Sequence, residues 1–460
     1  MRDKLRARLA KHEFLRHLLI LMSGTAVAQL LPILASPIIS RLYSPHEVGI
    51  YTAFMALVAG VITIATWRYD MAIVLPKKVE DARALVKLAN RVSALTCVLV
   101  GLVLIIFAAP ISAWLKAPDL RFWIGGVGFV AWAFAQVSVF NYWCNRNKNY
   151  KLMSTNRIGQ SVTTTGTQLG FGALHVGTAG LIVSTFLGQL VAAGNLFRKT
   201  RQEIYGLPSS PTRKVMRDYR KMPLINGPTA VLDTVRNNGV QLMISAYFSA
   251  AALGQFGQAW KMLQTPAGLI NSSLSQVFFQ KLSVTPRGQM LRVVRAGIVR
   301  SALIGIVPFV AIYFLSPPLF PIIFGERWAL AGQIGAALVP WLYLNFITSP
   351  ISMLFVVTQR QGVLFWFGIP FTAAPLTLIA TQHSHILQTM MWLSLTMAGL
   401  LSIFLLLALW VASGYDRGVG ASIQGNADEL AFAESAVETA TGEDVEEPPT
   451  SGAGQGPAPR

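Results

Sequence analysis

Long apolar stretches alternate with short, basic loops along most of this chain of 460 residues. A helix that spans a bilayer needs about 20 mostly apolar residues, because each residue advances the helix by about 1.5 Å. Backbone polar groups inside the hydrocarbon must be hydrogen-bonded within the chain, so these stretches are expected to be helices. The pattern predicts an all-α integral membrane protein with about 12 transmembrane helices. Their expected positions are 17–40, 48–66, 92–115, 121–143, 158–174, 177–197, 223–247, 252–278, 297–316, 328–357, 362–380 and 388–413.

The composition and the distribution of charge support this class. Charged residues make up only 13% of the chain, about half the fraction in a typical soluble domain. The net charge of +18 could indicate nucleic-acid binding. However, most Lys and Arg residues lie in alternate loops, and the intervening loops contain only Arg41, Lys116, Arg121 and Arg327. This asymmetry follows the positive-inside rule, so both termini are expected in the cytoplasm and no nucleic-acid partner is expected.

Changes in charge and hydropathy divide the chain into five segments. Six-helix lobes are expected at 17–200 and 223–413, joined by a basic cytoplasmic linker at 201–222. A basic segment at 1–16 is expected at the cytoplasmic membrane surface. The tail at 414–460 is acidic and has too little apolar surface to fold alone. We therefore expect a mostly disordered cytoplasmic tail.

Two weak internal repeats indicate a duplication. Ile39–Tyr51 resembles Ile244–Phe256, which lies 205 residues later, and Val130–Trp132 resembles Val339–Trp341, which lies 209 residues later. A shift of six helices preserves orientation in the membrane. The repeats therefore predict two pseudo-symmetric six-helix lobes related by an axis along the membrane normal.

The first copy of the longer repeat contains a helix-start signal. Ser44 is a candidate N-cap, Pro45 suits the first helical turn, and Glu47 completes a capping box. The second copy retains Ser249 as a candidate cap but lacks the acidic residue. Both helices are expected to begin abruptly after a very short external turn.

No catalytic signature is present. The chain contains no Walker sequence, no GxSxG, no HExxH and no Cys/His set with metal-ligand spacing. We therefore expect no catalytic residue, no metal site, no cofactor and no enzymatic activity.

Charged residues at membrane depth are the best candidates for a functional site. Such charges are costly and normally face a bundle interior or a wet cavity. Lys261 lies about 13 Å into the expected helix 252–278, near the midplane. A cation facing an internal cavity favours an anionic ligand such as phosphate, although a structural role for Lys261 is the alternative. Arg68 and Asp70 close the second helix at its cytoplasmic end, where an interfacial anchor and a functional site both fit.

The expected helix 223–247 is the most polar span. Asp233 and Arg236 are three residues apart and share a face, so they could form a structural ion pair or belong to a site. Asn237 and Gln241 lie nearby in the same helix and are candidate polar groups of a cavity.

Several runs of residues resemble one family. They are ISRLYSPHEVGIY at 39–51, RYDMAIVLP at 68–76, YWCNRNKNYKL at 142–152, SQVFFQK at 275–281 and PWLYLNFITSPISMLF at 340–355. These runs are similar to those of the bacterial polysaccharide-biosynthesis flippases. This family comprises the O-antigen translocases of the multidrug/oligosaccharidyl-lipid/polysaccharide exporter superfamily.

The resemblance implies two lobes in a MATE-like V shape. It also implies transport of an undecaprenyl-pyrophosphate-linked oligosaccharide across the bacterial inner membrane, for O-antigen or exopolysaccharide biosynthesis. Lys261 matches a basic residue of the family's eighth helix, and Arg68 matches the Arg of its R-Y-D/E run. Lys261 is expected to bind the pyrophosphate with help from Arg236 and Arg68, while Asp233 tunes or couples the site. Membrane lipids, a polysaccharide polymerase and glycosyltransferases are the implied partners.

Three other functions compete with this hypothesis. A multidrug or cation antiporter of the same superfamily should have an acidic pore, whereas Asp233 is the main acidic candidate here. A membrane polysaccharide polymerase or ligase should carry a large, charged external loop, but the expected external loops are short. An assembly scaffold would make Lys261 merely structural.

Overall fold

The long elements of the protein are all helices. The computed structural model describes residues 23–220, 222–382 and 384–418. In that part of the chain, nine helices are long and apolar enough to cross a membrane. Three further helices have similar lengths but more polar residues, and within the described residues each of the twelve expected spans is mainly helical. The long elements are Ser23–Leu42, α2 (Pro45–Ala65), α4 (Val79–Ile106), α7 (Val127–Arg146), α8 (Tyr150–Ala173), α9 (Thr178–Tyr205), α11 (Gly227–Tyr247), α12 (Ala250–Ser283), α13 (Met290–Phe324), α14 (Ala329–Ala337) with α15 (Val339–Ile351) and α16 (Met353–Val357), α17 (Gln361–Thr381) and α18 (Ile386–Asp416).

The prediction of an all-α integral membrane protein is therefore confirmed. Short elements connect the long helices: α3 (Tyr69–Ala72), α5 (Ala108–Trp114), α6 (Leu120–Ile124), α10 (Thr212–Asp218), the π-helix η1 (Met222–Asn226) and the 3₁₀-helix η2 (Glu326–Trp328). The segment expected at 1–16, and the tail expected at 414–460 apart from residues 414–418, lie outside the described residues.

Several helix boundaries differ from the sequence expectation; for example, α8 begins at Tyr150 and not near residue 158, and α13 spans Met290–Phe324 and not 297–316. Helix α4 begins at Val79 instead of near residue 92, because its first turns carry charged residues that lower the local hydropathy. The tenth span, expected as one helix at 328–357, is interrupted at Leu338 and Ser352. Pro340 lies just after the first interruption, where the missing N–H of proline disfavours a continuous helix.

Both expected helix starts are confirmed. The Ser44 side chain accepts the backbone N–H of Glu47, and the Glu47 carboxylate accepts the backbone N–H of Ser44 at 2.7 Å. At the start of α12, the Ser249 side chain accepts the N–H of Ala252 at 3.1 Å. The capping box is complete in the first copy and half-present in the second, as their sequences predict.

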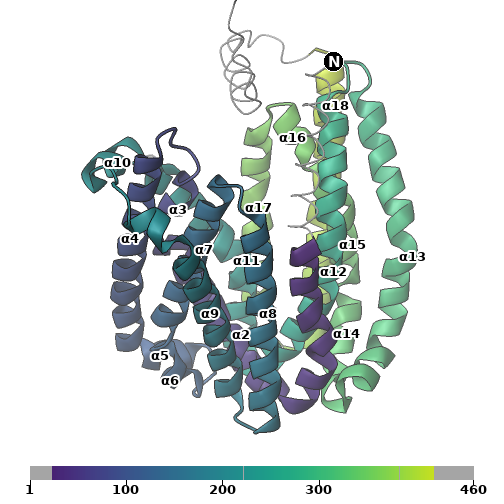
Figure 1. Cartoon of the computed structure of the whole chain (residues 1–460). Helices are drawn as coiled ribbons and strands as arrows, with labels where there is room; N and C mark the ends of the chain where they lie inside the picture. Colours follow the sequence, from purple (N-terminus) through teal and green to yellow (C-terminus); the bar gives the residue numbers. More distant parts are fainter. Residues whose placement is uncertain (1–22, 221, 383, 419–460) are drawn as a thin grey trace, which may run out of the picture.

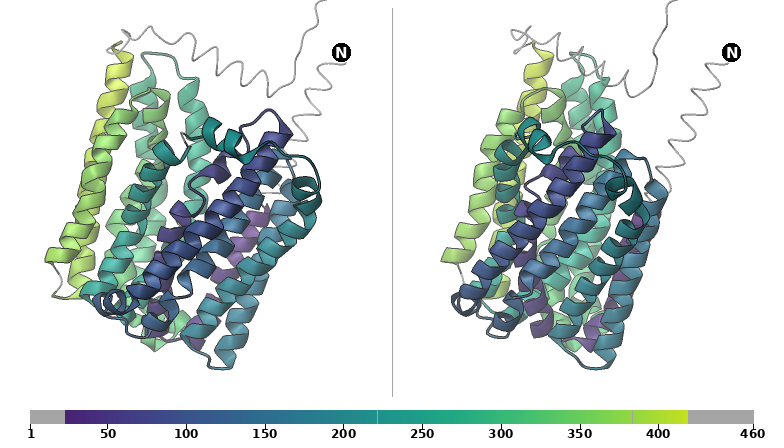
Figure 2. Two further views of the ribbon diagram at one scale, coloured as in Figure 1. Left: turned by 90° about the vertical axis from the view of Figure 1, so that its left-hand side faces the viewer. Right: turned by 60° about the vertical axis from the view of Figure 1, so that its left-hand side comes forward.

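Helices α2 to α9 and helices α12 to α18 form two adjacent groups, coloured mainly blue and green to yellow, while the dark purple N-terminal helix lies beside α12 (Figures 1 and 2). The helix Ser23–Leu42 lies between α8 and α12. Ser161 of α8 donates to the carbonyl of Ala28 at 2.7 Å, and Gln258 of α12 donates to the Ser36 hydroxyl at 2.9 Å. This helix therefore contacts both lobes.

Helices α2 and α12 form the closest contact between the lobes. A Cβ atom on Gly49 would overlap the carbonyl oxygen of Ala250, and one on Gly254 would overlap the carbonyl oxygen of Pro45. Each residue of the second copy lies 205 positions after its counterpart, so the two contacts are equivalent. The pseudo-twofold axis predicted from the repeat passes between the first turns of α2 and α12.

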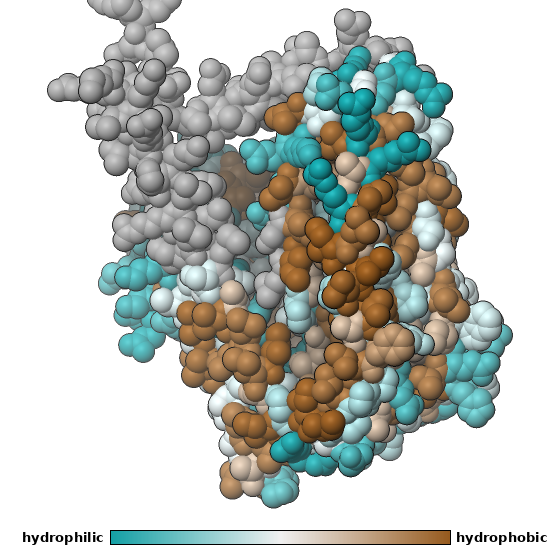
Figure 3. Space-filling view, turned by 90° about the vertical axis from the view of Figure 1, so that its right-hand side faces the viewer, coloured by the Kyte–Doolittle hydropathy of each residue, from teal (hydrophilic) through white to brown (hydrophobic). Residues whose placement is uncertain are grey.

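The outer surface of the C-terminal lobe is apolar. Helix α13, which faces the viewer in Figure 3, belongs to a broad brown band with hydrophilic residues at its two ends. Leu303 is 64% exposed and Val307 is 73% exposed. Side chains this exposed and this apolar indicate contact with lipid acyl chains.

Candidate functional site

Two equivalent hydrogen bonds join the lobes at one end of the molecule. Ser40 donates to the carbonyl of Phe324 at 3.2 Å, and Ser245 donates to the carbonyl of Leu115 at 2.7 Å; both bonds are buried. The two serines are 205 residues apart and the two acceptors are 209 residues apart, which are the offsets of the sequence repeats. The duplication is therefore present in the contacts that close this end.

Cations of the short loops strengthen this closure. Lys116 donates to the carbonyl of Tyr247 at 2.8 Å, and Arg327 donates to the carbonyl of Arg41. Arg41 in turn donates to the carbonyl of Ile322 at 3.4 Å. Three of the four cations that depart from the positive-inside pattern thus bind backbone carbonyls of the opposite lobe. We call the end that contains these contacts the closed end.

Lys261 lies on the face of α12 that points toward the N-terminal lobe. Gly254, Gln258, Lys261 and Thr265 are spaced by four, three and four residues, which places them on one stripe of the helix. Gly254 and Gln258 contact the N-terminal lobe, the first through the carbonyl of Pro45 and the second through a serine hydroxyl. Lys261 follows one turn later, about 16 Å from the start of α12.

The direct contacts along this stripe end before Lys261. Its side chain is exposed, although protein atoms surround it densely, so it lies in a recess and not on the outer surface. Its ammonium group has no hydrogen bond or ion pair with any residue that the structure describes. A cation in such a place is available to an anionic ligand that enters between the lobes.

Helix α11 contributes a second inter-lobe stripe. Thr234 and the Thr63 hydroxyl of α2 are hydrogen-bonded at 2.5 Å, and Ser245 makes the closing bond described above. Gln241 lies between these two contacts on the same stripe and is half-buried. Arg236, two residues from Thr234, lies about 200° around the helix and therefore on the opposite side. The side chains of Asp233 and Asn237 lie outside the described part of the chain.

Asp70 is held inside the N-terminal lobe. It is 6% exposed, and its two carboxylate oxygens accept the hydroxyls of Thr66 and Ser138, each at 2.8 Å. These bonds tie the end of α2 and the short helix α3 to α7. The arrangement gives Asp70 a structural role at this position.

Arg68 introduces the sharp turn between α2 and α3. Its backbone is left-handed, with φ of 61°, and its Nε atom is buried without a hydrogen-bond partner among the described residues. Because α2 and α12 start at the same level, Arg68 lies about 18 Å farther from the closed end than Lys261. Arg68 and Lys261 are therefore separated along the membrane normal, whereas Arg236, 11 residues before the end of α11, lies at about the depth of Lys261.

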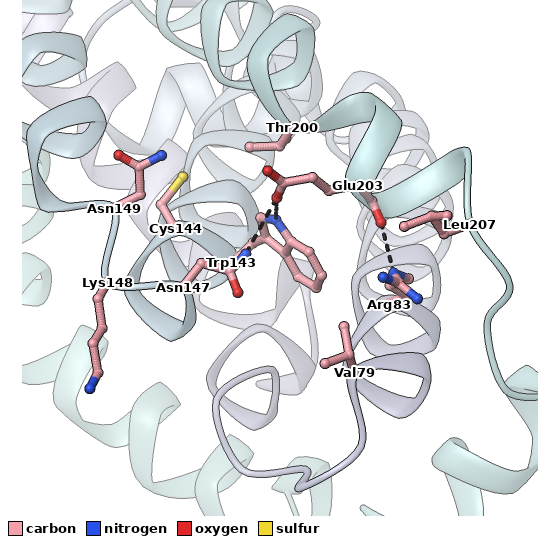
Figure 4. Close-up of a pocket in the computed structure, with 10 residues that line it drawn as sticks. All are labelled: Val79, Arg83, Trp143, Cys144, Asn147, Lys148, Asn149, Thr200, Glu203 and Leu207. Carbon is pink, nitrogen blue, oxygen red and sulfur yellow. Dashed lines mark hydrogen bonds between the residues drawn. The ribbon is translucent and has the colours of Figure 1, made fainter.

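A cavity of about 520 Å³ at the expected cytoplasmic end of the N-terminal lobe was not predicted from the sequence (Figure 4). The carboxylate of Glu203 accepts the indole N–H of Trp143 at 3.1 Å and the amide N–H of Asn147 at 3.4 Å. Arg83 donates to the backbone carbonyl of Glu203 at 2.7 Å. These polar groups are already engaged with one another. The run at 142–152 contained the signal, because it places an indole, amides and cations at one helix end.

Comparisons with known proteins agree on family and fold. A sequence model described as "Polysaccharide biosynthesis protein" matches residues 38–332. No curated protein sequence matches the chain.

Several solved structures are similar in fold. An inward closed conformation of the lipid II flippase MurJ has a TM-score of 0.66 at 14% identity, covering 94% of each chain. An inward-facing multidrug resistance MATE family transporter of the MOP superfamily has a TM-score of 0.61 at 12% identity, covering 85% of this chain and 96% of its own. The MATE multidrug transporter DinF-BH in complex with R6G has a TM-score of 0.53 at 14% identity, covering 85% and 93%. The two-lobed fold is that of this group of membrane transporters.

Proposed function

Because the chain belongs to the polysaccharide biosynthesis protein family, we propose that it is a flippase for an undecaprenyl-pyrophosphate-linked oligosaccharide. It moves this lipid from the cytoplasmic to the outer leaflet of the bacterial inner membrane, and both of its termini lie in the cytoplasm. The product supplies surface polysaccharide such as O-antigen or exopolysaccharide. Glycosyltransferases that build the oligosaccharide and a polymerase that consumes it are the corresponding partners.

The exposed ammonium of Lys261 is the observation that supports this proposal. A pyrophosphate at mid-membrane depth loses water, and a compact fixed cation replaces part of that hydration. Gln241, on the inter-lobe stripe of α11, offers an amide to phosphate or sugar hydroxyls. The polyprenyl chain remains in the lipid beside the lobes.

The other predicted residues have separate parts in the proposal. Arg68 lies farther toward the expected cytoplasmic side, where it meets the headgroup before Lys261 does. Arg236 adds positive potential from α11, and Asp233 and Asn237 tune that helix. Asp70 maintains the turn that carries Arg68.

The closed end supports alternating access as the mechanism. Outward opening has to break the paired serine hydrogen bonds, each of which contributes about 1 kcal/mol net. Contacts of this size close the pathway and still permit reversible opening. The two lobes would rotate about the α2–α12 contact, exposing Lys261 first to the cytoplasmic side and then to the outside.

A complementation experiment tests the function. The variants Lys261→Gln and Lys261→Glu are expressed in a host that lacks the native gene, where we expect both to insert normally. Each should reduce surface polysaccharide at least about tenfold, because charge-assisted contacts with phosphate contribute roughly 1.5–3 kcal/mol. Lys261→Arg should retain part of the activity. Lys281→Gln, which removes an exposed cation near the end of the same helix, is the matched control.

The same strains separate the rival functions. Full polysaccharide production by well-expressed Lys261→Glu would remove this residue from the mechanism. Normal polysaccharide in the deletion strain, together with a new sensitivity to cationic drugs, would favour the antiporter.

A further inference from the structure

The N-terminal lobe contains a second cavity, of about 730 Å³, between α4, α7 and α9. Its lining has one polar, basic region and one aromatic, apolar region. The polar, basic region comes from the first half of α4, to which the end of α9 adds the Tyr205 hydroxyl. The lining residues used below are Lys87, Asn90, Arg91, Trp132, Phe140 and Tyr205.

This cavity is separate from the space between the lobes. Helix α2 forms the inter-lobe contact, and Trp67 at its end donates to the hydroxyl of Thr96 on α4 at 3.2 Å. Thr96 lies nine residues after Lys87, which places the two on opposite faces of α4. The cavity therefore lies on the side of α4 that points away from α2, at the outer edge of the molecule where Figure 1 shows α4.

The polar region of the cavity has unused binding capacity. Asn90 donates to the Tyr205 hydroxyl at 2.8 Å, while its Oδ1 atom is buried without a hydrogen-bond partner among the described residues. Lys87 donates to Ser209 at 2.9 Å and lies 5.7 Å from the centre of the Tyr205 ring. Arg91 is exposed, and none of the described residues that line the cavity is acidic. The region offers two cations and a hydrogen-bond acceptor, the Oδ1 atom of Asn90. This combination suits an anion that also carries a hydroxyl group.

The depth of these groups matches a lipid of the cytoplasmic leaflet. The cations occupy the first half of α4, and from Leu95 onward the helix exposes apolar side chains, including Leu99 and Leu102. The boundary between headgroups and acyl chains therefore falls near Leu95.

Gln136 of α7 donates to the Ser93 hydroxyl of α4 at 3.1 Å, and α7 runs antiparallel to α4. Trp132, one turn before Gln136, therefore lies on the apolar side of this boundary, and Phe140, one turn after it, lies at the level of the cations. Cations at the depth of the headgroups and an aromatic side chain at the depth of the acyl chains match the polarity of a phospholipid in this leaflet.

We propose that this cavity binds an anionic glycerophospholipid, with its phosphate between Lys87 and Arg91. A hydroxyl of the headgroup donates to the Oδ1 atom of Asn90. The first part of the acyl chains lies along Trp132, and the remainder extends into the bilayer, while Phe140 packs beside the headgroup. A cavity of this volume is in the usual range for ligand sites, and it accommodates a headgroup with the first part of the chains.

Binding is tested with delipidated protein in detergent by native mass spectrometry. The probes are phosphatidylglycerol, phosphatidylcholine with the same acyl chains, and soluble glycerol phosphate. We expect phosphatidylglycerol to bind at least about tenfold more tightly than phosphatidylcholine, because each cation near a lipid surface contributes roughly 1 kcal/mol. Glycerol phosphate should neither bind nor compete at equal concentration, because it lacks acyl chains.

Variants assign the preference to this cavity. Lys87→Gln with Arg91→Gln should abolish it. Asn90→Asp should weaken it by adding a negative charge beside the two cations, and its carboxylate can accept the Tyr205 hydroxyl to which the Asn90 amide donates. Lys199→Gln with Arg201→Gln removes two exposed cations of α9 outside the cavity and should retain the preference. Equal binding of the two lipids, equal losses in the control, or binding of glycerol phosphate alone would each overturn the proposal. Binding is measured without transport, so the outcome is independent of the proposed function.

Discussion

At the scale of single residues, two glycines determine how closely the lobes approach. Gly49 and Gly254 pack against backbone carbonyls of the opposite lobe, where any side chain would overlap an oxygen atom. Backbone atoms cannot move aside as the end of a flexible side chain can. These positions therefore require glycine for packing, and the requirement does not come from an unusual φ angle.

Gly254→Val should accordingly destabilise the protein. Overpacking of this kind costs about 1–3 kcal/mol, and we expect a lower apparent Tm in detergent with a broader size-exclusion peak. Gly268→Ala is the control on the same helix, because its Cβ would meet no atom within 4 Å. This control should be neutral or slightly stabilising. Equal melting of Gly254→Val and the original protein would show that α2 and α12 do not pack as described.

At the scale of helices, sequence patterns predicted the number and type of elements better than their ends. Apolar length identified the spans because the bilayer imposes it. The same criterion missed the first turns of α4, where residues such as Arg83 and Lys87 belong to the helix but lie beyond the apolar region. Lys261 was identified because a charge at mid-depth stands out in a hydropathy pattern. The Oδ1 atom of Asn90 was not identified from the sequence, because the burial of this atom and its hydrogen-bond partners depend on three helices that come together only in the fold.

The caps of α2 and α12 offer a comparison between two related helix starts. Ser44 belongs to a complete capping box, whereas Ser249 satisfies a single backbone N–H. Ser44→Ala removes the cap and releases Glu47 from the Ser44 hydroxyl, with which it also bonds at 2.9 Å. We expect a loss of about 1–2 kcal/mol for Ser44→Ala and a smaller loss for Ser249→Ala. The order of the apparent Tm values checks this prediction, and a larger effect at Ser249 would contradict it.

At the scale of the whole molecule, the duplication produces a pair of equivalent hydrogen bonds between the lobes. The Ser40–Phe324 and Ser245–Leu115 hydrogen bonds lie on the two sides of the pseudo-twofold axis, and each joins one lobe to the other. Because this axis relates the two bonds, a symmetric separation of the lobes at the closed end loads both of them equally. The two lobes differ farther from the closed end, at the position of Lys261. Its counterpart in the first lobe is Ala56, which is 3% exposed. In the proposed function, a symmetric closure therefore encloses a site whose cation comes from one lobe.

Removing these two inter-lobe hydrogen bonds should shift the protein toward an outward-open state. With about 1 kcal/mol per hydrogen bond, Ser40→Ala and Ser245→Ala should each raise the outward-open population about fivefold, and the double variant about 30-fold. The measurement is labelling of Lys261→Cys from the outside of intact cells with a membrane-impermeant maleimide. The native Cys97 and Cys144 are buried and give little background. Similar increases for the two single variants follow from the pseudo-symmetry, whereas unchanged labelling of the double variant would show that other contacts hold this end closed.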